Sequence, residues 1–126
     1  MSRQIVAIVE DNPDNRLLVS IVLGDEYDTR EFETALEALD AFGEETPDIV
    51  LLDIALPGMD GLELLRLMRT HWTLAGVPVI ALTAHAMRGD RERYIAAGCD
   101  DYVSKPIEDL GVFKALVAAH LAAPRR

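Results

Sequence analysis

The chain has 126 residues, half of them hydrophobic, which is the size of one domain. Its formal net charge is −10 and its pI is near 4.6. This acidic balance excludes a typical nucleic-acid binder, which needs a basic surface. Cys99 is the single cysteine, which excludes disulfide scaffolds and cysteine-rich zinc sites and predicts a reducing compartment, with Cys99 as a small core residue. The polar start of the chain and the lack of a long apolar stretch predict neither a signal peptide nor a membrane span, so we expect a cytoplasmic protein.

Strand and helix patterns alternate five times along the chain, which is typical of α/β architecture. The apolar residues 5–9 predict a first strand. Asn12 and Pro13 then predict the N-cap and first residue of a helix that ends at Gly24. Residues 27–33 mix β-forming and charged residues, as an exposed edge strand does. The apolar side chains at helical spacing in the first helix are Leu17, Leu18, Ile21 and Val22.

Two capping patterns predict the second and third helices. Thr34 with Glu37 predicts a helix that ends at Gly43, and Asp60 with Glu63 predicts another. Between them, residues 49–52 predict a buried strand that ends at Asp53. We expect Leu36, Leu39 and Phe42 to point inward from the second helix, and Leu64, Leu65 and Met68 from the third.

The last part of the chain predicts a central strand at residues 77–82, which are almost all apolar, and a short strand at Tyr102 and Val103. The helix expected between them, at about 87–97, has a weak apolar face, so we expect it to be one of the more mobile elements. Glu108 and Asp109 open the fifth helix. Its apolar stripe consists of Leu110, Phe113, Leu116, Val117 and Leu121.

Five units of this size predict a doubly wound (βα)5 fold, a flavodoxin-like three-layer sandwich with a parallel five-stranded sheet in the order 2-1-3-4-5. In that order, ligands bind at the carboxyl ends of the first and third strands. Glu10 and Asp11 follow the first strand and Asp53 follows the third. The sequence therefore predicts an acidic site at this edge.

Three converging carboxylates need a positive partner. Two like charges about 4 Å apart repel by about 4 kcal/mol at an effective dielectric of about 20, and a domain has only about 5 to 15 kcal/mol of net stability. A bound hard cation and Lys105, which follows the last predicted strand, are the candidates.

These motifs together resemble the receiver domain of the two-component response-regulator family. The matching residues lie at the ends of predicted strands and cover essentially the whole chain. Stretches 84–90 and 98–107 are also similar to DivK-type single-domain regulators and to the receivers of hybrid kinases. The family motifs are the pair Glu10 and Asp11, the stretch 53–61, the pair Thr83 and Ala84, and the pair Lys105 and Pro106.

The resemblance implies that Asp53 accepts a phosphoryl group from a phosphohistidine. It implies that Asp11, Asp53 and the backbone carbonyl of Ala55 hold Mg²⁺, for which Mn²⁺ can substitute, with Glu10 acting through water. Lys105 would neutralise a phosphoryl oxygen.

The resemblance also implies roles around this centre. The Thr83 hydroxyl and the Ala84 N–H would donate hydrogen bonds to phosphoryl oxygens, and Tyr102 matches the aromatic ring that moves inward with the threonine. Pro106 would fix the Lys105 geometry through a cis bond. Ala55 and His85 occupy positions that influence the rate of phosphate loss.

The implied function is that of a phosphoacceptor signalling protein and not of an enzyme that turns over external substrates. A sensor histidine kinase or a histidine phosphotransfer protein would donate the phosphoryl group. The output would be protein contacts, including a possible homodimer, on the face formed by the fourth helix, fifth strand and fifth helix. We expect one receiver domain over residues 1–126, with 122–126 as a short tail, and neither nucleic acid nor membrane as a partner.

Other interpretations of the same residues stay open at this point. Asp11 is also a common helix N-cap, Asp53 a possible loop acid, Lys105 a surface lysine, Thr83 a β-former and Tyr102 a half-buried strand residue. Alternative functions are a flavodoxin-like cofactor protein, an aspartyl-phosphate phosphohydrolase and a phosphorylation-independent interaction domain. We expect His71, next to Trp72, at a helix end and His120 as a semi-exposed residue of the last helix. No histidine pair has metal-ligand spacing.

Overall fold

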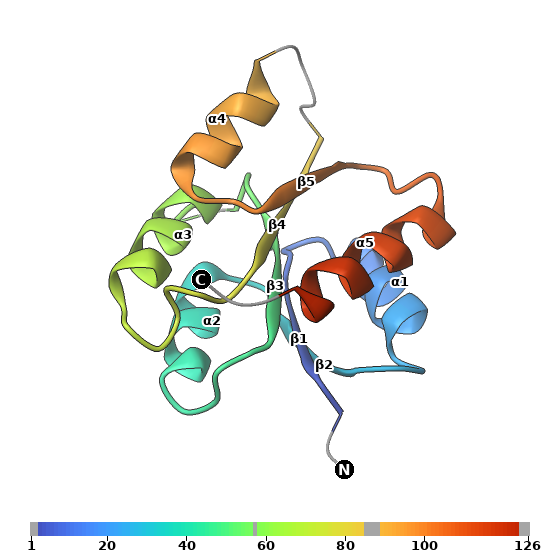
Figure 1. Cartoon of the computed structure of the whole chain (residues 1–126), viewed down its shortest axis with the longest axis horizontal. Helices are drawn as coiled ribbons and strands as arrows, with labels where there is room; N and C mark the ends of the chain where they lie inside the picture. The colour runs from blue at the N-terminus through green and yellow to red at the C-terminus, as the bar shows by residue number, and fades with distance from the viewer. Residues whose placement is uncertain (1–2, 57, 85–88, 124–126) are drawn as a thin grey trace.

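The computed structural model describes residues 3–56, 58–84 and 89–123. Its centre is a parallel five-stranded sheet in the order β2-β1-β3-β4-β5, which confirms the predicted doubly wound topology (Figure 1). The strand order reverses between β1 and β3, which is the predicted switch point. The strands are β1 Ile5–Val9, β2 Asp28–Phe32, β3 Ile49–Asp53, β4 Val79–Thr83 and β5 Asp101–Ser104.

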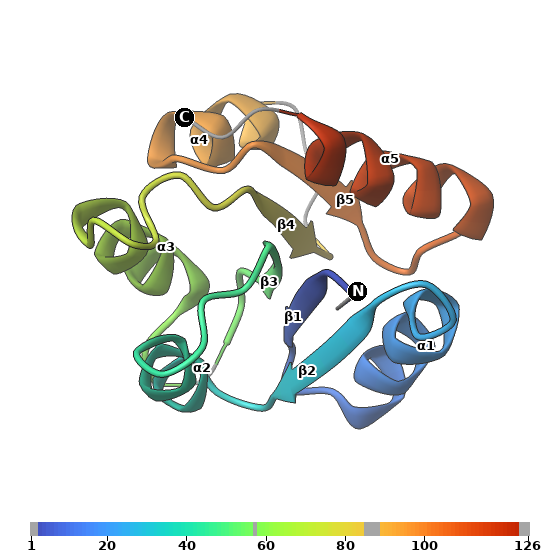
Figure 2. The same ribbon diagram turned by 60° about the horizontal axis from the view of Figure 1, so that its bottom comes forward.

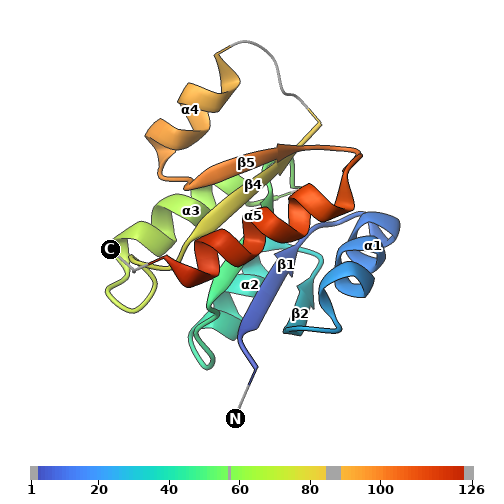
Figure 3. The same ribbon diagram turned by 45° about the vertical axis from the view of Figure 1, so that its right-hand side comes forward.

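Five helices cover the two faces of the sheet. Helices α2, α3 and α4 lie on one side, and α1 and α5 lie on the other (Figure 2). Helix α5 crosses its face of the sheet beside α1 (Figure 3). The helices are α1 Pro13–Leu23, α2 Ala35–Phe42, α3 Gly61–Thr70, α4 Asp90–Ala97 and α5 Leu110–Ala122.

Side-chain caps fix the beginnings of four helices, as their sequences predict. The Asn12 side chain accepts hydrogen bonds from two backbone N–H groups of α1, and Thr34, Asp60 and Asp109 each accept one. Helix α4 differs, since it follows Gly89 at φ 92° and has no side-chain cap bond. Its predicted first residues, 87 and 88, lie outside the described residues.

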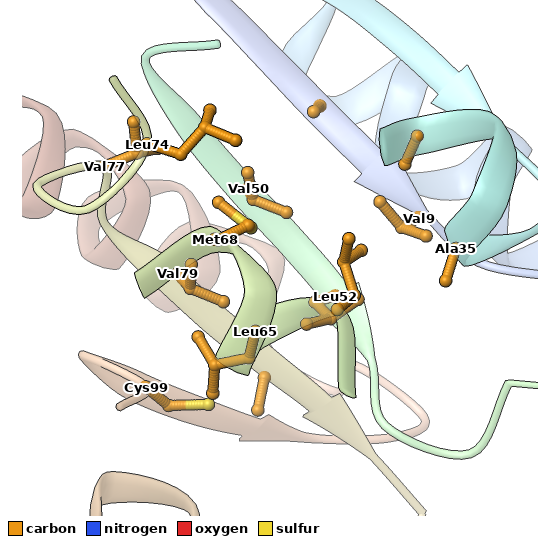
Figure 4. Packing of buried hydrophobic residues seen from close by; sticks show 14 of the residues in the cluster. Val9, Ala35, Val50, Leu52, Leu65, Met68, Leu74, Val77, Val79 and Cys99 are labelled. Atoms are coloured by element: carbon orange, nitrogen blue, oxygen red, sulfur yellow. The ribbon is translucent and has the colours of Figure 1, made fainter. Parts of the chain in front are cut away.

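Two buried clusters, one on each face, form the core. The cluster shown in Figure 4 joins β1, β3 and β4 to α2, α3 and α4, and the second joins the sheet to α1 and α5. The central strands β3 and β4 are buried along their whole length, whereas the edge strand β2 is half-exposed, as predicted. Cys99 is buried in the first cluster, and burial raises the pKa of its thiol to about 11, which agrees with a packing role.

The predicted apolar faces of α1, α2 and α5 are exposed in part. Helix α2 packs through Ala35, Ala38 and Phe42, and Leu36 is 57% exposed. The three buried positions follow the 3.6-residue period, and Leu36 lies one residue after Ala35, about 100° around the helix from it. In α1 the buried residues are Val19 and Leu23. Leu17, Leu18 and Ile21 are exposed, and so are Leu110 and Val112 at the start of α5.

Arg69 joins three segments of the chain near the amino ends of the strands. From α3, its guanidinium donates to the carbonyl of Gly98 at the end of α4 and to the carbonyl of Val77 before β4. It also forms a 3.0 Å ion pair with Asp100, whose carboxylate accepts the Val79 N–H. One side chain thus fixes the last turn of α4 against the beginnings of β4 and β5.

Among the described residues, no helix combines the length and the apolar character that crossing a membrane requires.

The predicted tail of residues 122–126 begins inside the last helix, because Ala122 is the last residue of α5. Residues 124–126 lie outside the described residues.

Candidate functional site

The acidic residues converge at the carboxyl ends of β1 and β3. Glu10 and Asp11 directly follow β1, and Asp53 is the last residue of β3. Their carboxylate oxygens lie within 4.8 Å of one another, although Glu10 and Asp53 are buried and Asp11 is exposed. The parallel pairing of β1 with β3 causes this convergence, since it brings the carboxyl ends of both strands to one edge.

Lys105 supplies the positive charge that the acids require. Its Nζ lies 3.0 Å from Glu10 Oε1 and 3.1 Å from Asp53 Oδ2. The backbone positions this side chain, because the Lys105 N–H donates to the Thr83 carbonyl at 2.7 Å and the bond between Lys105 and Pro106 is cis. Although partial burial alone would lower the pKa of Lys105, the two carboxylates raise it, so the ammonium stays charged.

Two neighbours hold Asp53 in place. The Ala55 N–H donates to Asp53 Oδ1 at 3.0 Å, while Lys105 contacts Oδ2. Burial alone would raise the pKa of Asp53, but the neighbouring Glu10 carboxyl, the Ala55 N–H and Lys105 together lower it. Asp53 therefore ionises more readily than Glu10, and an ionised carboxylate is what a nucleophile requires.

Gly61 allows the backbone after Asp53 to turn closely. A Cβ at Gly61 would lie 2.5 Å from the Asp53 carbonyl oxygen and 2.8 Å from Ile54 Cα. The Gly61 N–H donates to the Ile54 carbonyl at 3.2 Å. The first residue of α3 is thus packed against the backbone that carries Asp53.

Glu10 is completely buried, and its two oxygens have different surroundings. Oε1 accepts hydrogen bonds from Asn15 at 2.8 Å and from Lys105, but no described group donates to Oε2. Burial raises the pKa of Glu10 to about 7, and the adjacent Asp53 adds to this shift, while Lys105 and Asn15 oppose it. A buried carboxylate oxygen without a donor is costly unless a cation or an ordered water binds it.

The three carboxylates at the ends of β1 and β3 fit a hard divalent cation. Mg²⁺ takes oxygen ligands, uses one or two carboxylates and keeps several waters. Glu10, Asp11 and Asp53 supply only oxygens, and Asp11 lies on the solvent side where waters reach the site. The unpartnered Glu10 Oε2 is consistent with a water-mediated role toward such an ion.

The other predicted site residues lie around this centre. Thr83 is buried at the end of β4, and Ala84 follows it in an exposed position. Tyr102 is half-buried on β5. Ala55 is exposed, so its small side chain leaves open space next to Asp53. His85 lies outside the described residues.

Sequence reasoning missed three residues near the site. Asn15 holds Glu10, and Arg16 donates to the carbonyls of Glu10 and Asp11 at 3.0 and 3.4 Å. Both lie in the first turns of α1. Their position just after Glu10 and Asp11 was the feature of the sequence that could have predicted their contacts with the acid pair. Tyr94, whose hydroxyl lies 3.2 Å from Thr83 Oγ1, gave no comparable signal, because a tyrosine in a weak apolar face does not indicate which residue its hydroxyl contacts.

The remaining histidines are not part of the site. His71 caps the end of α3, as predicted. His120 Nε2 lies 3.1 Å from Asp101 Oδ2, so this half-buried residue links α5 to β5.

Comparison with known proteins agrees with this geometry. The model of the response regulator receiver domain matches residues 6–117. The chain belongs to this family. The polar-differentiation response regulator DivK of Brucella ovis is 45% identical over 103 residues, which cover 81% of this chain and 84% of that protein.

Solved receiver structures also superimpose on the chain. A putative response regulator from Chloroflexus aurantiacus has a TM-score of 0.90 at 29% identity, over 97% of this chain and 100% of that one. The receiver domain of sensor histidine kinase PA1611 from Pseudomonas aeruginosa has a TM-score of 0.87 at 30% identity, over 97% and 100% of the two chains, and it was crystallised with a magnesium ion coordinated in the active site cleft.

Proposed function

We propose that the chain is a phosphoacceptor response regulator that receives a phosphoryl group on Asp53 and acts in the cytoplasm through protein contacts. The observation that carries the proposal is the environment of Asp53, a buried carboxylate with a lowered pKa, 3.1 Å from the Lys105 ammonium and beside two further acids. A carboxylate held in this way can attack phosphorus in line, and the nearby positive charge neutralises the incoming group.

The transfer forms one bond and breaks another. An Asp53 oxygen bonds to the phosphorus of a phosphohistidine, the P–N bond breaks, and the imidazole nitrogen keeps the electron pair and takes a proton. Lys105 lies where it can bind a phosphoryl oxygen, since its Nζ already contacts Asp53 Oδ2. The Ala55 N–H holds the other Asp53 oxygen and so limits rotation of the carboxylate.

The group implied at this site is Mg²⁺, which would lower the repulsion between the acids and the phosphoryl group. Asp11, Asp53 and the Ala55 carbonyl would hold it, with Glu10 acting through water. Thr83 and the Ala84 N–H would bind the remaining phosphoryl oxygens, because the carboxyl end of β4 adjoins that of β3. This machinery phosphorylates its own aspartate and slowly loses the phosphate, and it does not turn over an external substrate.

The phosphodonor, a sensor histidine kinase or a phosphotransfer protein, would dock beside α1. Leu17 and Ile21 are 56% and 65% exposed, and Leu18 borders a small pocket that also includes Lys105 and Pro106. An apolar surface next to the phosphoacceptor suits a helix of the donor. Output to a downstream protein, or to a second copy of the chain, would use the face of α4, β5 and α5.

Intact-mass measurement tests the proposal. With Mg²⁺ and a small phosphodonor, the protein should gain one phosphoryl group, and Asp53→Asn or a chelator should abolish the gain. Asp40→Asn, which changes an exposed aspartate of α2, should leave the gain unchanged. A phosphate that maps to another residue would contradict the assignment.

A further inference from the structure

Tyr94 connects the buried side of α4 to the end of β4. Its side chain is 2% exposed and belongs to the same cluster as Ala81 and Cys99. Its hydroxyl oxygen lies 3.2 Å from Thr83 Oγ1, and Thr83 is itself 3% exposed. Buried hydroxyl groups need hydrogen-bond partners because they have lost water, so this contact is worth more than an exposed one.

Strand alternation explains why Thr83 faces Tyr94. Along β4, Ala81 lies in the cluster of α2, α3 and α4, and Leu82 lies in the cluster of α1 and α5. Thr83, two residues after Ala81, therefore has its side chain on the α4 side of the sheet. Asp53 pairs with Leu82, so the phosphoacceptor lies across from the residue that precedes Thr83.

Tyr94 also limits the space that Tyr102 could enter. The two rings are tilted by 53°, with centroids 6.4 Å apart. Tyr94 is buried and Tyr102 is half-buried, so Tyr94 forms the inner wall next to Tyr102. The position of Thr83 and the room for Tyr102 thus depend on one side chain of α4.

We propose that Tyr94 is a positioning residue that holds Thr83 on the α4 side of β4 in the unphosphorylated protein, through the bond between the two hydroxyls. This inference rests on the proposed phosphorylation of Asp53. Either hydroxyl can be the donor in this contact, and because the Thr83 hydroxyl has one proton, a phosphoryl oxygen that accepts it competes with Tyr94 wherever Thr83 is the donor. When Thr83 turns toward the phosphoryl group, Tyr94 loses this partner, and the change passes directly into α4.

Removal of one oxygen tests the inference. In Tyr94→Phe the ring remains and the bond to Thr83 is lost. In the unphosphorylated, Mg²⁺-loaded variant, the Thr83 methyl resonance and the amide resonances of Asp90–Ala97 should move part of the way toward their positions in the phosphorylated parent. Loss of one buried hydrogen bond should shift the ratio of the two Thr83 positions about three- to tenfold.

Two controls separate positioning from packing. Tyr27→Phe removes a hydroxyl on the opposite side of the sheet and should leave the Thr83 resonance in place. In a Thr83→Ala background, Tyr94→Phe should no longer move the α4 resonances toward the phosphorylated state, because the two residues act through one bond.

The outcomes distinguish this inference from the proposed function. If both proteins gain a phosphoryl group but the unphosphorylated spectra of parent and Tyr94→Phe overlay at Thr83 and α4, the inference is wrong and the proposed function stands. If neither protein gains a phosphoryl group on Asp53, the proposed function fails, and the inference fails with it.

Discussion

Lys105 and Glu10 are 95 residues apart in the sequence, and yet Lys105 Nζ lies 3.0 Å from Glu10 Oε1. The same ammonium contacts Asp53, so one side chain links the loop after β5 to the ends of β1 and β3. Both carboxylates are buried, and among the described residues Lys105 is the only cation that forms an ion pair with either of them. The first prediction follows from this dependence.

Replacement of Lys105 by methionine should lower the free energy of unfolding of the metal-free protein by about 2 to 4 kcal/mol, because it leaves buried carboxylates without a counter-charge. Mg²⁺ should restore more stability to the variant than to the parent. Chemical denaturation with and without Mg²⁺ measures both effects. Lys114→Met removes a lysine that pairs with Glu26 on the surface and should change little. Equal losses in the two variants would contradict a special role for Lys105.

Gly61→Ala should destabilise the protein and slow phosphorylation of Asp53. The new Cβ would meet the Asp53 carbonyl and Ile54 Cα, which are backbone atoms, so the loop that carries the phosphoacceptor must shift. Thermal unfolding and phosphorylation time courses measure the two effects. Gly111→Ala in α5 is the matched control and should stabilise the protein by roughly 0.5 to 1 kcal/mol.

The stability of the metal-free protein should fall as the pH rises from about 4.5 to about 7. The pKa of Glu10 is raised from 4.5 to about 7 in the folded state, so in this window the folded protein binds a proton that the unfolded chain has released. The Glu10 contribution is complete below pH 4.5 and is lost as the pH passes 7. The lowered pKa of Asp53 acts in a separate window, below its ordinary value of 3.8.

Unfolding free energies measured in a chelator across this pH range check the sign. Glu10→Gln should remove the slope between pH 4.5 and 7, because the amide does not titrate, and Mg²⁺ should reduce it in the parent. A parent whose stability rises with pH over this window would overturn the prediction.

Substitution of Ala55 should change the lifetime of the phosphorylated form more than the fold. The Ala55 side chain is exposed next to Asp53, and its N–H holds the Asp53 carboxylate. Ala55→Asn adds a polar group at the solvent side of the acyl phosphate and should alter the rate of phosphate loss severalfold, by repositioning water. From the family resemblance we expect the same of His85→Ala. Dephosphorylation time courses that overlay the parent for both variants would count against a role in rate control.

The output face should respond to a stable acyl-phosphate mimic. We expect the largest changes in amide exchange outside the acidic site at α4 and near Tyr102, since Thr83 contacts Tyr94 and Lys105 follows β5. The exposed surface of α2 should change little. If protection changes are confined to the loop after Asp53, this face is not the output surface.

Much of this architecture is readable from the sequence because local signals agree with the global pattern. Asn12, Thr34, Asp60 and Asp109 cap helices as their positions predict, and the continuous apolar runs of β3 and β4 are buried on both faces. The acids converge because strand order determines which carboxyl ends meet. The matching family and solved structures support the same fold.

What the sequence did not predict depends on rotation and on contacts between distant elements. The rotation of α2 about its axis buries Ala35 and Ala38 and exposes Leu36. The sequence predicted Leu36 as an inward residue because leucine is the larger and more hydrophobic side chain. The contact between Tyr94 and Thr83 arises only when α4 packs against β4. A tyrosine in a weak apolar face gives no sign of which residue its hydroxyl will reach.

The Arg69 contacts anchor the Gly98 end of α4, which makes that end a pivot for any rotation of the helix. Gly98, at the end of this helix, is held by two guanidinium nitrogens, whereas its beginning follows Gly89 without a side-chain cap. A small rotation about the Gly98 end displaces each residue in proportion to its distance from that pivot. In any such rotation the first turn of α4 moves farther than the last, so a partner bound at the first turn would be more sensitive to a change at Thr83 than one bound near Gly98.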